Sequence, residues 1–314
     1  MDVIIVCHTE FGFADGKKTI FEKTATKGVK DGVANLLKLA EKYGAKITFA
    51  VCPEVVDYFP KNTGHEVGLH IHPGWEEFKR AGFKWYVGDQ YLKEHCKQAL
   101  VSSALQDHPY SEQLDMIKTG KERLKISLGI EPNVFVAGRW SLNNDTIRVL
   151  TELGFTHDCS AYPGLKLSYL DWSKLSRICM PYRPSIDDYQ KKGDMPILMV
   201  PVSRMLLRGI AGPEDASKYG FSWLKACFKE YHKQGAPLFH IALHSPVMTD
   251  PYYIFLADDF LSFILKYDNV NFKFVSEIKE YPAQNFKTDL LPYLLHLNKE
   301  VIKTIFRKSL RIKK

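Results

Sequence analysis

The chain places two histidines at the end of a short apolar strand pattern, in the run Gly64-His65-Glu66-Val67-Gly68-Leu69-His70-Ile71-His72-Pro73. Successive side chains of a strand point to opposite faces, so His70 and His72 share one face. A similar arrangement stands near the start of the chain, where residues 3–6 are apolar and His8-Thr9-Glu10 follow. His8 and Glu10 therefore also share a face.

Short apolar runs alternate with longer stretches of helical period along most of the chain. Strands are predicted over residues 3–6, 46–51, 66–72, 133–137, 197–202, 238–243 and 272–275. Helices are predicted over residues 30–43, 110–128, 143–153, 219–234 and 258–267. About seven strands that alternate with helices predict an α/β fold with a parallel sheet, and so many units favour a (β/α) barrel over an open sheet.

Polar residues collect where the predicted strands end, which is where barrels of this kind carry their functional groups. Gly138-Arg139-Trp140, Asp158 and His244 occupy three of these ends. Glu10, His70 and His72 together offer a carboxylate and two imidazoles. Three such donors with an open position for water are typical of a catalytic zinc site. The alternative for any one of them is a hydrogen-bonded residue of the barrel rim.

Composition and charge exclude several classes of protein. The 314 residues are 45% hydrophobic and 25% charged, which is ordinary for a globular chain. Six cysteines without CxxC spacing do not form a disulfide scaffold, and neither a signal peptide nor a membrane-spanning run is recognisable. A cytoplasmic protein is therefore predicted, with the inner face of the membrane as one possible location.

The net charge of +7 is concentrated near the C-terminus. Residues 299–314 carry seven basic side chains and one acid, a net charge of +6. The rest of the chain is nearly neutral, so no nucleic-acid partner is predicted. Residues 288–314 also carry an apolar stripe at helical spacing, and a basic amphipathic helix of this kind is typical of peripheral contact with an anionic membrane. The alternative is a helix packed against the barrel. We predict a barrel domain over residues 1–284 and a tail over residues 285–314.

Four segments, taken in order, resemble the polysaccharide deacetylase family, whose members share a NodB homology domain and are grouped with carbohydrate esterase family 4. They are residues 64–73, Ala137-Gly138-Arg139-Trp140-Ser141, Asp158-Cys159-Ser160-Ala161-Tyr162-Pro163-Gly164 and Leu243-His244-Ser245-Pro246. The likeness covers about residues 1–280. It implies a distorted (β/α) barrel and metal-dependent hydrolysis of an N-acyl group, usually acetyl, from an amino sugar.

The resemblance also implies roles for individual residues. Glu10 and His70 fall at metal-ligand positions, and the metal is most often Zn²⁺. The family's second histidine lies four residues after the first, but position 74 is glycine, so His72 is the best substitute. His8 falls at or beside the place of the catalytic base and His244 at that of the acid.

Further positions in the motifs are implied to orient the site or to meet the substrate. Asp158 falls where a carboxylate orients the acid, and Arg139 is a candidate to orient the site or stabilise the oxyanion. Trp75, Trp140 and Tyr162 follow three of the motifs, where their rings would either stack on a sugar or only wall the barrel mouth.

Two departures from the family pattern leave the activity open. His8 replaces the usual aspartate base, and Val136 stands where an arginine commonly pairs with that aspartate. A neutral imidazole base has no need of the arginine, which favours a working N-deacetylase of surface-glycan or lipopolysaccharide biosynthesis. Its substrate would be an amino-sugar-containing glycan or the lipid- or nucleotide-linked precursor. The alternatives are a degenerate sugar-binding or membrane-peripheral protein, and a metal-dependent hydrolase of a small non-sugar amide.

Overall fold

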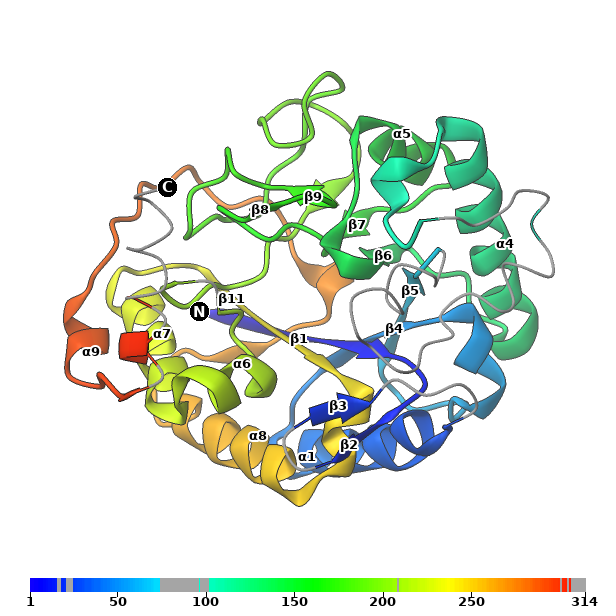
Figure 1. The fold of residues 1–314 in the computed structure, drawn as a ribbon. Helices are drawn as coiled ribbons and strands as arrows, with labels where there is room; N and C mark the ends of the chain where they lie inside the picture. The colour runs from blue at the N-terminus through cyan, green and yellow to red at the C-terminus, as the bar shows by residue number, and fades with distance from the viewer. Residues whose placement is uncertain are drawn as a thin grey trace.

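A single parallel sheet organises the computed structural model (Figure 1), which describes residues 1–15, 18–20, 25–73, 96, 102–207, 209–299, 301–303 and 305. Seven strands follow the order β10-β7-β6-β5-β4-β1-β11, and β12 pairs with β1 beside this path. Their bounds are β1 (Asp2–Thr9), β4 (Ile47–Val51), β5 (Glu66–Ile71), β6 (Val134–Ala137), β7 (His157–Asp158), β10 (Leu198–Met199), β11 (Leu238–His244) and β12 (Asn271–Phe272). The predicted distorted (β/α) barrel is confirmed.

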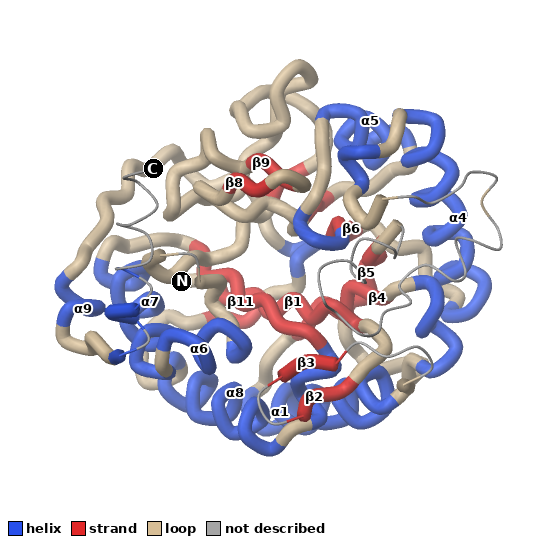
Figure 2. Tube along the Cα trace, in the orientation of Figure 1, coloured by secondary structure: helices blue, strands red, loops and turns tan. Residues whose placement is uncertain are grey.

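Helices surround the outside of this sheet, as the tube in Figure 2 shows. They are α1 (Val33–Tyr43), α4 (Tyr110–Leu128), α5 (Asn144–Glu152), α6 (Pro213–Tyr219), α7 (Phe221–Lys233), α8 (Pro251–Ile264) and α9 (Leu291–Leu294). Val3 and Ile5 of β1 belong to the large buried cluster between sheet and helices, whereas Ile4 and Val6 belong to a smaller cluster inside the barrel. Both faces of the strands are therefore buried, as in other parallel sheets.

An irregular segment joins the two ends of the strand order. Ser203, which follows β10, donates its backbone N–H to the carbonyl of His240 on β11, and its hydroxyl accepts the N–H of His240. Ala242 donates its N–H to Ala211 further along the same segment. The barrel thus closes through individual hydrogen bonds between residues 203–211 and β11, which is why it is distorted.

Helix α1 begins as a π-helical turn, η1 (Gly28–Gly32), that packs against the loop after β11. A Cβ atom at Gly32 would lie 2.1 Å from the carbonyl oxygen of Ser245, so only glycine allows this approach. The contact fixes η5 (Ser245–Thr249), which directly follows the predicted acid His244. Packing at this end of the barrel therefore fixes the position of the loop that begins directly after His244.

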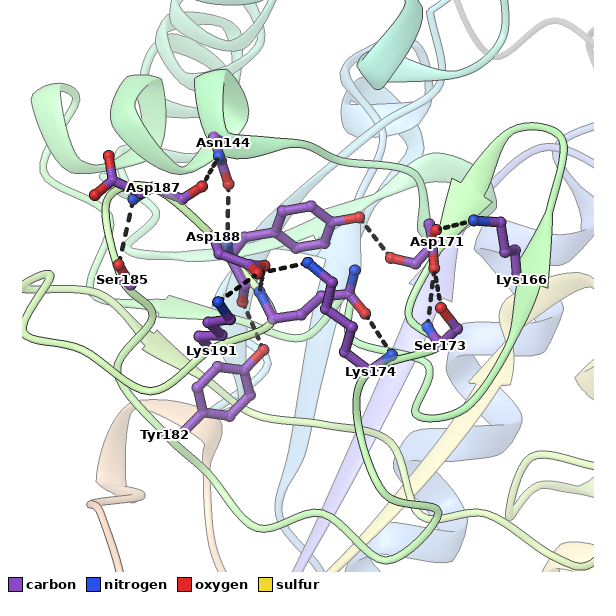
Figure 3. Close-up of polar contacts among 12 residues, drawn as sticks. Asn144, Lys166, Asp171, Ser173, Lys174, Tyr182, Ser185, Asp187, Asp188 and Lys191 are labelled. Atoms are coloured by element: carbon purple, nitrogen blue, oxygen red, sulfur yellow. Dashed lines mark hydrogen bonds and ion pairs between the residues drawn. The ribbon is translucent and has the colours of Figure 1, made fainter.

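Residues 163–197, between β7 and β10, form a long polar segment that the sequence pattern did not resolve into elements. It contains the hairpin β8 (Lys166–Leu167) and β9 (Leu170–Asp171). Figure 3 shows Asp188 between Lys174 and Lys191, with N–O distances of 2.5 and 3.8 Å. In the same view Asn144, at the start of α5, bonds to the carbonyl of Asp187. These contacts tie the segment to the barrel wall.

Most predicted elements are present, and the differences have local causes. Helix α8 begins at Pro251 rather than at residue 258, because Asp250 caps it by accepting the N–H of Tyr252 and proline suits the first helical position. Helix α6 and the hairpin β2 (Phe13–Asp15) and β3 (Lys18–Ile20) were not predicted. Elements of three to seven residues are too short to display a period.

The described residues between 288 and 303 pack beside α7 through two buried side chains. Tyr293 and Val301 belong to the large core cluster, and Tyr293 donates its hydroxyl hydrogen to the buried carboxylate of Glu230 at 2.9 Å. The indole of Trp223 donates to the carbonyl of His296 at 2.9 Å. Residues 300, 304 and 306–314 of the tail lie outside the described residues, and the domain boundary at residue 284 stays a prediction.

No helix among the described residues combines the length and the hydrophobicity needed to span a membrane.

Candidate active site

The predicted metal ligands meet at the carboxyl ends of β1 and β5. Glu10 Oε1 lies 3.0 Å from His70 Nε2 and 3.4 Å from His72 Nε2. All three side chains are buried. Nitrogen and oxygen donors about 2.0–2.1 Å from a tetrahedral zinc are separated by roughly 3.3–3.4 Å from one another. The distances from Glu10 Oε1 to the Nε2 atoms of His70 and His72 are therefore close to the distances between ligand atoms in a zinc site.

The hydrogen bonding of His70 calls for a cation beside it. Its Nδ1 lies 2.8 Å from the carbonyl oxygen of Val136, and its Nε2 lies 3.0 Å from Glu10 Oε1. Both neighbours are acceptors, whereas a neutral imidazole carries a single N–H. If Nδ1 donates to the carbonyl, the lone pair of Nε2 faces a carboxylate oxygen. A proton or a metal ion between these atoms resolves the conflict, and an Nδ1–carbonyl bond of this kind is the usual support of a metal-binding histidine.

The charge states of the other two residues also suit metal binding. Burial by itself would raise the pKa of Glu10, but the charges and hydrogen bonds of His72 and His70 hold it well below its usual value. Burial lowers the pKa of His72 to about 4, against the opposing effect of Glu10. His72 is therefore neutral at pH 7 with a lone pair available, and its contact with Glu10 is not an ion pair.

Gly138 makes room for this arrangement. A Cβ atom there would lie 2.5 Å from the carbonyl oxygen of Ile71 and 2.6 Å from the ring of His72. The next two residues, Arg139 and Trp140, both have left-handed backbone conformations with φ of 56° and 60°. Such conformations cost about 1–3 kcal/mol each for residues other than glycine and concentrate at functional sites. Arg139 and Trp140 thus form a strained, sharp turn beside His72.

Buried contacts hold this strained turn in place. The indole of Trp172, from the segment after β7, donates to the carbonyl of Trp140 at 2.8 Å. Arg139 donates to the hydroxyl of Ser103 at 2.6 Å, and its guanidinium lies 3.6 Å from the ring centre of Tyr169. Arg139 is therefore fixed at the mouth of the barrel, while its predicted role toward an oxyanion stays a prediction.

His8 occupies the floor of the site, between the predicted ligands and the predicted acid. Its ring centre lies 4.6 Å from that of His70 and 4.6 Å from that of His244. Its Nε2 is buried and has no hydrogen-bond partner among the described residues. Burial and the neighbouring charges of His244 and His70 hold the pKa of His8 well below its usual value. His8 is therefore a neutral imidazole that is able to accept a proton.

The carboxylate that orients His244 is Glu214 and not, as predicted, Asp158. Glu214 Oε1 accepts from His244 Nδ1 at 2.9 Å and from the backbone N–H of His244 at 2.8 Å. Burial by itself would lower the pKa of His244, but the hydrogen bond and charge of Glu214 outweigh it and raise the pKa. The sequence did carry a signal for this residue, because Gly212-Pro213-Glu214-Asp215 has the proline and acids typical of a helix start.

Asp158 lies at the end of β7 and bonds to the residue two positions along the chain. Its Oδ1 accepts the backbone N–H of Ser160 at 2.8 Å, and its Oδ2 accepts the hydroxyl of Ser160 at 2.7 Å. That hydroxyl in turn accepts the backbone N–H of Ala137 at 2.7 Å. Burial raises the pKa of Asp158 to about 7. Asp158 thus supports the end of β6, from which the strained turn begins.

Of the two predicted aromatic residues that the structure describes, Trp140 lies nearer to His8. Its ring centre is 4.9 Å from that of His8 and 5.7 Å from that of Tyr162. Tyr162 is only 8% exposed and has the guanidinium of Arg204 at 4.9 Å from its ring centre. This packing makes Tyr162 part of the wall behind Trp140. Trp75 lies outside the described residues.

Solved structures share this arrangement of strands and helices. A protein described as a putative polysaccharide deacetylase, from Mycobacterium smegmatis, aligns with a TM-score of 0.54 and 16% identity over 87% of this chain and 88% of its own. A probable polysaccharide deacetylase from Pseudomonas aeruginosa PAO1 aligns with a TM-score of 0.55 and 16% identity over 88% of each chain. The protein has the polysaccharide deacetylase fold.

The same fold also occurs in an enzyme with a different name. The Puue allantoinase aligns with a TM-score of 0.56 and 17% identity over 88% of each chain. No family model matches the sequence, and no curated protein matches it. At these identities the comparisons establish the polysaccharide deacetylase fold. The chemistry of the site is inferred from its own residues.

Replacing Glu214 by glutamine is expected to move the alkaline limb of the activity profile to lower pH. In its predicted role as the acid, His244 would work only while it is protonated, so its contribution would be lost as the pH rises through its pKa. Glutamine removes the charge that raises this pKa, and the loss then begins at a lower pH. The measurement is kcat against pH for both proteins, with Glu277→Gln as a control at an exposed ion pair with Lys46. An alkaline limb at the same pH in both proteins would show that Glu214 does not raise the pKa that sets this limb.

Proposed function

We propose that this protein is a metal-dependent hydrolase that removes an N-acetyl group from an amino sugar. One observation carries the proposal: both nitrogens of buried His70 face oxygen acceptors, one of them the ionised Glu10. Imidazole and carboxylate donors together suit a borderline-soft divalent cation such as Zn²⁺. The deacetylases among the structures of the same fold support the amino-sugar substrate.

Glu10, His70 and His72 are the residues that would hold the cation. Bound there, it supplies Lewis acidity toward the amide carbonyl and the attacking water. Neutral His8 accepts the proton of that water as its oxygen forms a bond to the carbonyl carbon. Protonated His244 donates its proton to the amide nitrogen as the C–N bond breaks. The products are acetate and a free amino sugar, and a base–acid pair of this kind accounts for the positions of both histidines.

The remaining residues position these two. Glu214 binds Nδ1 of His244, so the proton to be donated is carried on Nε2, and its charge stabilises the imidazolium. Trp140 covers His8 from the side and offers an aromatic surface to a sugar ring. Burial of His8, Glu10 and His70 removes water from around them, which strengthens electrostatic interactions in the site.

Product analysis tests this proposal. The zinc-loaded protein is incubated with N-acetylated amino-sugar oligosaccharides, and acetate and free amine are both measured. We expect the two products to form in equal amounts and to disappear when the metal is removed and not restored. Absence of acetate from all such oligosaccharides, with the metal bound, would reject the amino-sugar substrate.

A hydrolase of a small non-sugar amide is the second candidate. It is favoured by the presence of an allantoinase among the structures of the same fold. The proposed roles of His8, His244 and the cation are the same for this substrate, because the bond to be broken is again an amide C–N bond. Release of an amine or carboxylate from small cyclic amides, with none from the oligosaccharides, would select this function.

We further propose that the tail brings the enzyme to an anionic membrane, where a lipid-linked glycan precursor of surface-glycan biosynthesis would be its substrate. Tyr293 and Val301 hold the segment against the barrel, yet five leucines on it are exposed: Leu290, Leu291, Leu294, Leu295 and Leu297. Lys229 and Lys233 of α7 line a cavity of about 350 Å³ together with Leu291 and Leu295. Exposed leucines beside lysines suit the surface of an anionic bilayer.

Replacing Leu295 by glutamate is expected to weaken binding to vesicles that contain phosphatidylglycerol by at least about tenfold, since burying one leucine contributes about 1.5–3 kcal/mol. Ile126→Glu on α4 is the matched control, because Ile126 is 71% exposed and Leu295 is 74% exposed. Co-sedimentation with vesicles measures both variants. Equal binding of the two variants would show that the leucines of the tail are not the membrane contact.

A further inference from the structure

The register of the sheet places a cysteine between two of the proposed metal ligands. Thr9 of β1 pairs with Val51 of β4, and Val51 pairs with Leu69 of β5. The next residues along the chain are Glu10, Cys52 and His70: the first two directly follow the ends of β1 and β4, and His70 lies within β5. The backbone N–H of Cys52 bonds to the carbonyl of Thr9 at 3.1 Å, so the pairing of β1 and β4 continues one residue beyond the strands. With this register the side chains of Glu10, Cys52 and His70 are neighbours on one face. The thiol of Cys52 therefore lies at the end of the strand between the carboxylate and the imidazole.

Distances and burial agree with the register. A carboxylate oxygen of Glu10, the sulfur of Cys52 and a ring nitrogen of His70 all lie within 4.8 Å of one another, and all three residues are buried. Two further observations indicate that a cation belongs here. His70 faces two acceptors, and the Nε2 of His8, also buried, has no partner among the described residues. A cation held between Glu10 and His70 would lie close to the sulfur of Cys52.

We propose that Cys52 is a ligand of the metal, in addition to Glu10, His70 and His72. This inference rests on the metal centre of the proposed function. On binding, the S–H bond breaks, the sulfur forms a bond to the metal, and the proton leaves to solvent. Four protein donors and one open position give five-coordination, which catalytic zinc sites sometimes reach in the transition state. A thiolate also selects zinc or cobalt over magnesium and calcium, which prefer oxygen ligands.

Cobalt(II) binding tests the role of Cys52 without an activity assay. The metal-depleted full-length protein is titrated with Co²⁺, and absorbance in the near ultraviolet reports charge transfer from thiolate to cobalt. We expect this band in the wild type and in Cys227→Ser, a matched control at a buried thiol on α7. The band should be absent in Cys52→Ser and Cys52→Ala, and present in His72→Ala. Zinc affinity of Cys52→Ser should fall by more than about tenfold, since even residues outside the ligand set contribute 10–100-fold.

The outcomes separate this inference from the proposed function. Cobalt bound to the wild type without the charge-transfer band overturns the role of Cys52 and leaves the metal centre intact. A charge-transfer band that persists in both Cys52 variants would likewise overturn the role of Cys52 and leave the metal centre intact. No cobalt bound to the wild type overturns the metal centre and the inference together. The wild-type spectrum needs no variant to fold, and near-ultraviolet circular dichroism verifies the folding of each variant.

Discussion

Replacing Glu10 by alanine is expected to remove the bound metal and to abolish hydrolysis. Glu10 is the only carboxylate that contacts both His70 and His72 in the part of the chain that the structure describes. Without it the two imidazoles lose the negative charge that offsets the charge of the cation. Loss of a residue that only supports a ligand already costs about 10–100-fold in metal affinity, so loss of this ligand should cost more than about 100-fold.

Metal content after dialysis and acetate release measure this effect together. Glu112→Ala is the matched control, because Glu112 also bonds to a histidine, with 2.9 Å between its Oε2 and His108 Nδ1, but lies on α4 outside the site. That control should keep its metal and its turnover. Glu10→Ala with full metal content and unchanged turnover would place the centre elsewhere. A variant that keeps metal yet loses turnover would instead assign Glu10 to the chemistry.

Replacing His8 by alanine is expected to leave the metal bound and to lower kcat by about 100- to 10,000-fold, the usual contribution of one positioned base. His8 is neutral because burial lowers its pKa, and it lies beside both His70 and His244. Without its ring the attacking water loses the group proposed to accept its proton. Metal content and kcat are measured on the same preparation.

The arrangement of donors makes this variant informative. His8, Glu10 and His244 also place three donor atoms within 4.8 Å of one another, so His8 has a second possible role as a metal ligand. Loss of metal from His8→Ala would select that role and leave the base unassigned. Unchanged turnover would remove His8 from the mechanism. His65→Ala is the control, since His65 is partly buried at the start of β5 and its ring accepts the backbone N–H of Ile47.

The sequence predicted those parts of the site that lie on regular strands. Alternation along each strand was enough to place His70 and His72 on one face of their strand, and His8 and Glu10 on one face of theirs. The parallel arrangement of the two strands then brings the two pairs together. Cys52 was missed because its position depends on the register between strands, which no pattern within one strand contains. Glu214 was missed because His244 and Glu214 are 30 residues apart, and no local period links them.

The difference between regular and irregular segments also explains which parts of the fold were predicted from the sequence. Long strands and helices with a clear period, such as β11 and α4, were predicted to within one or two residues. The closure between residues 203–211 and β11 depends on single backbone and side-chain hydrogen bonds, which leave no repeating pattern in the sequence. Asp158 was paired with His244 by the order of motifs alone, whereas in the structure its own neighbour Ser160 is its bonding partner.

Anomalous diffraction at the zinc absorption edge, from crystals of the zinc-loaded protein, tests the central claim most directly. Both ring nitrogens of His70 face oxygen acceptors, and a metal ion bound by Nε2 and by Oε1 of Glu10 would satisfy them. We predict one strong peak within bonding distance of both atoms, about 2.0–2.2 Å from each. A structure with zinc in the crystal but no peak at this position, and with a proton shared between His70 and Glu10 instead, would contradict the metal-dependent mechanism.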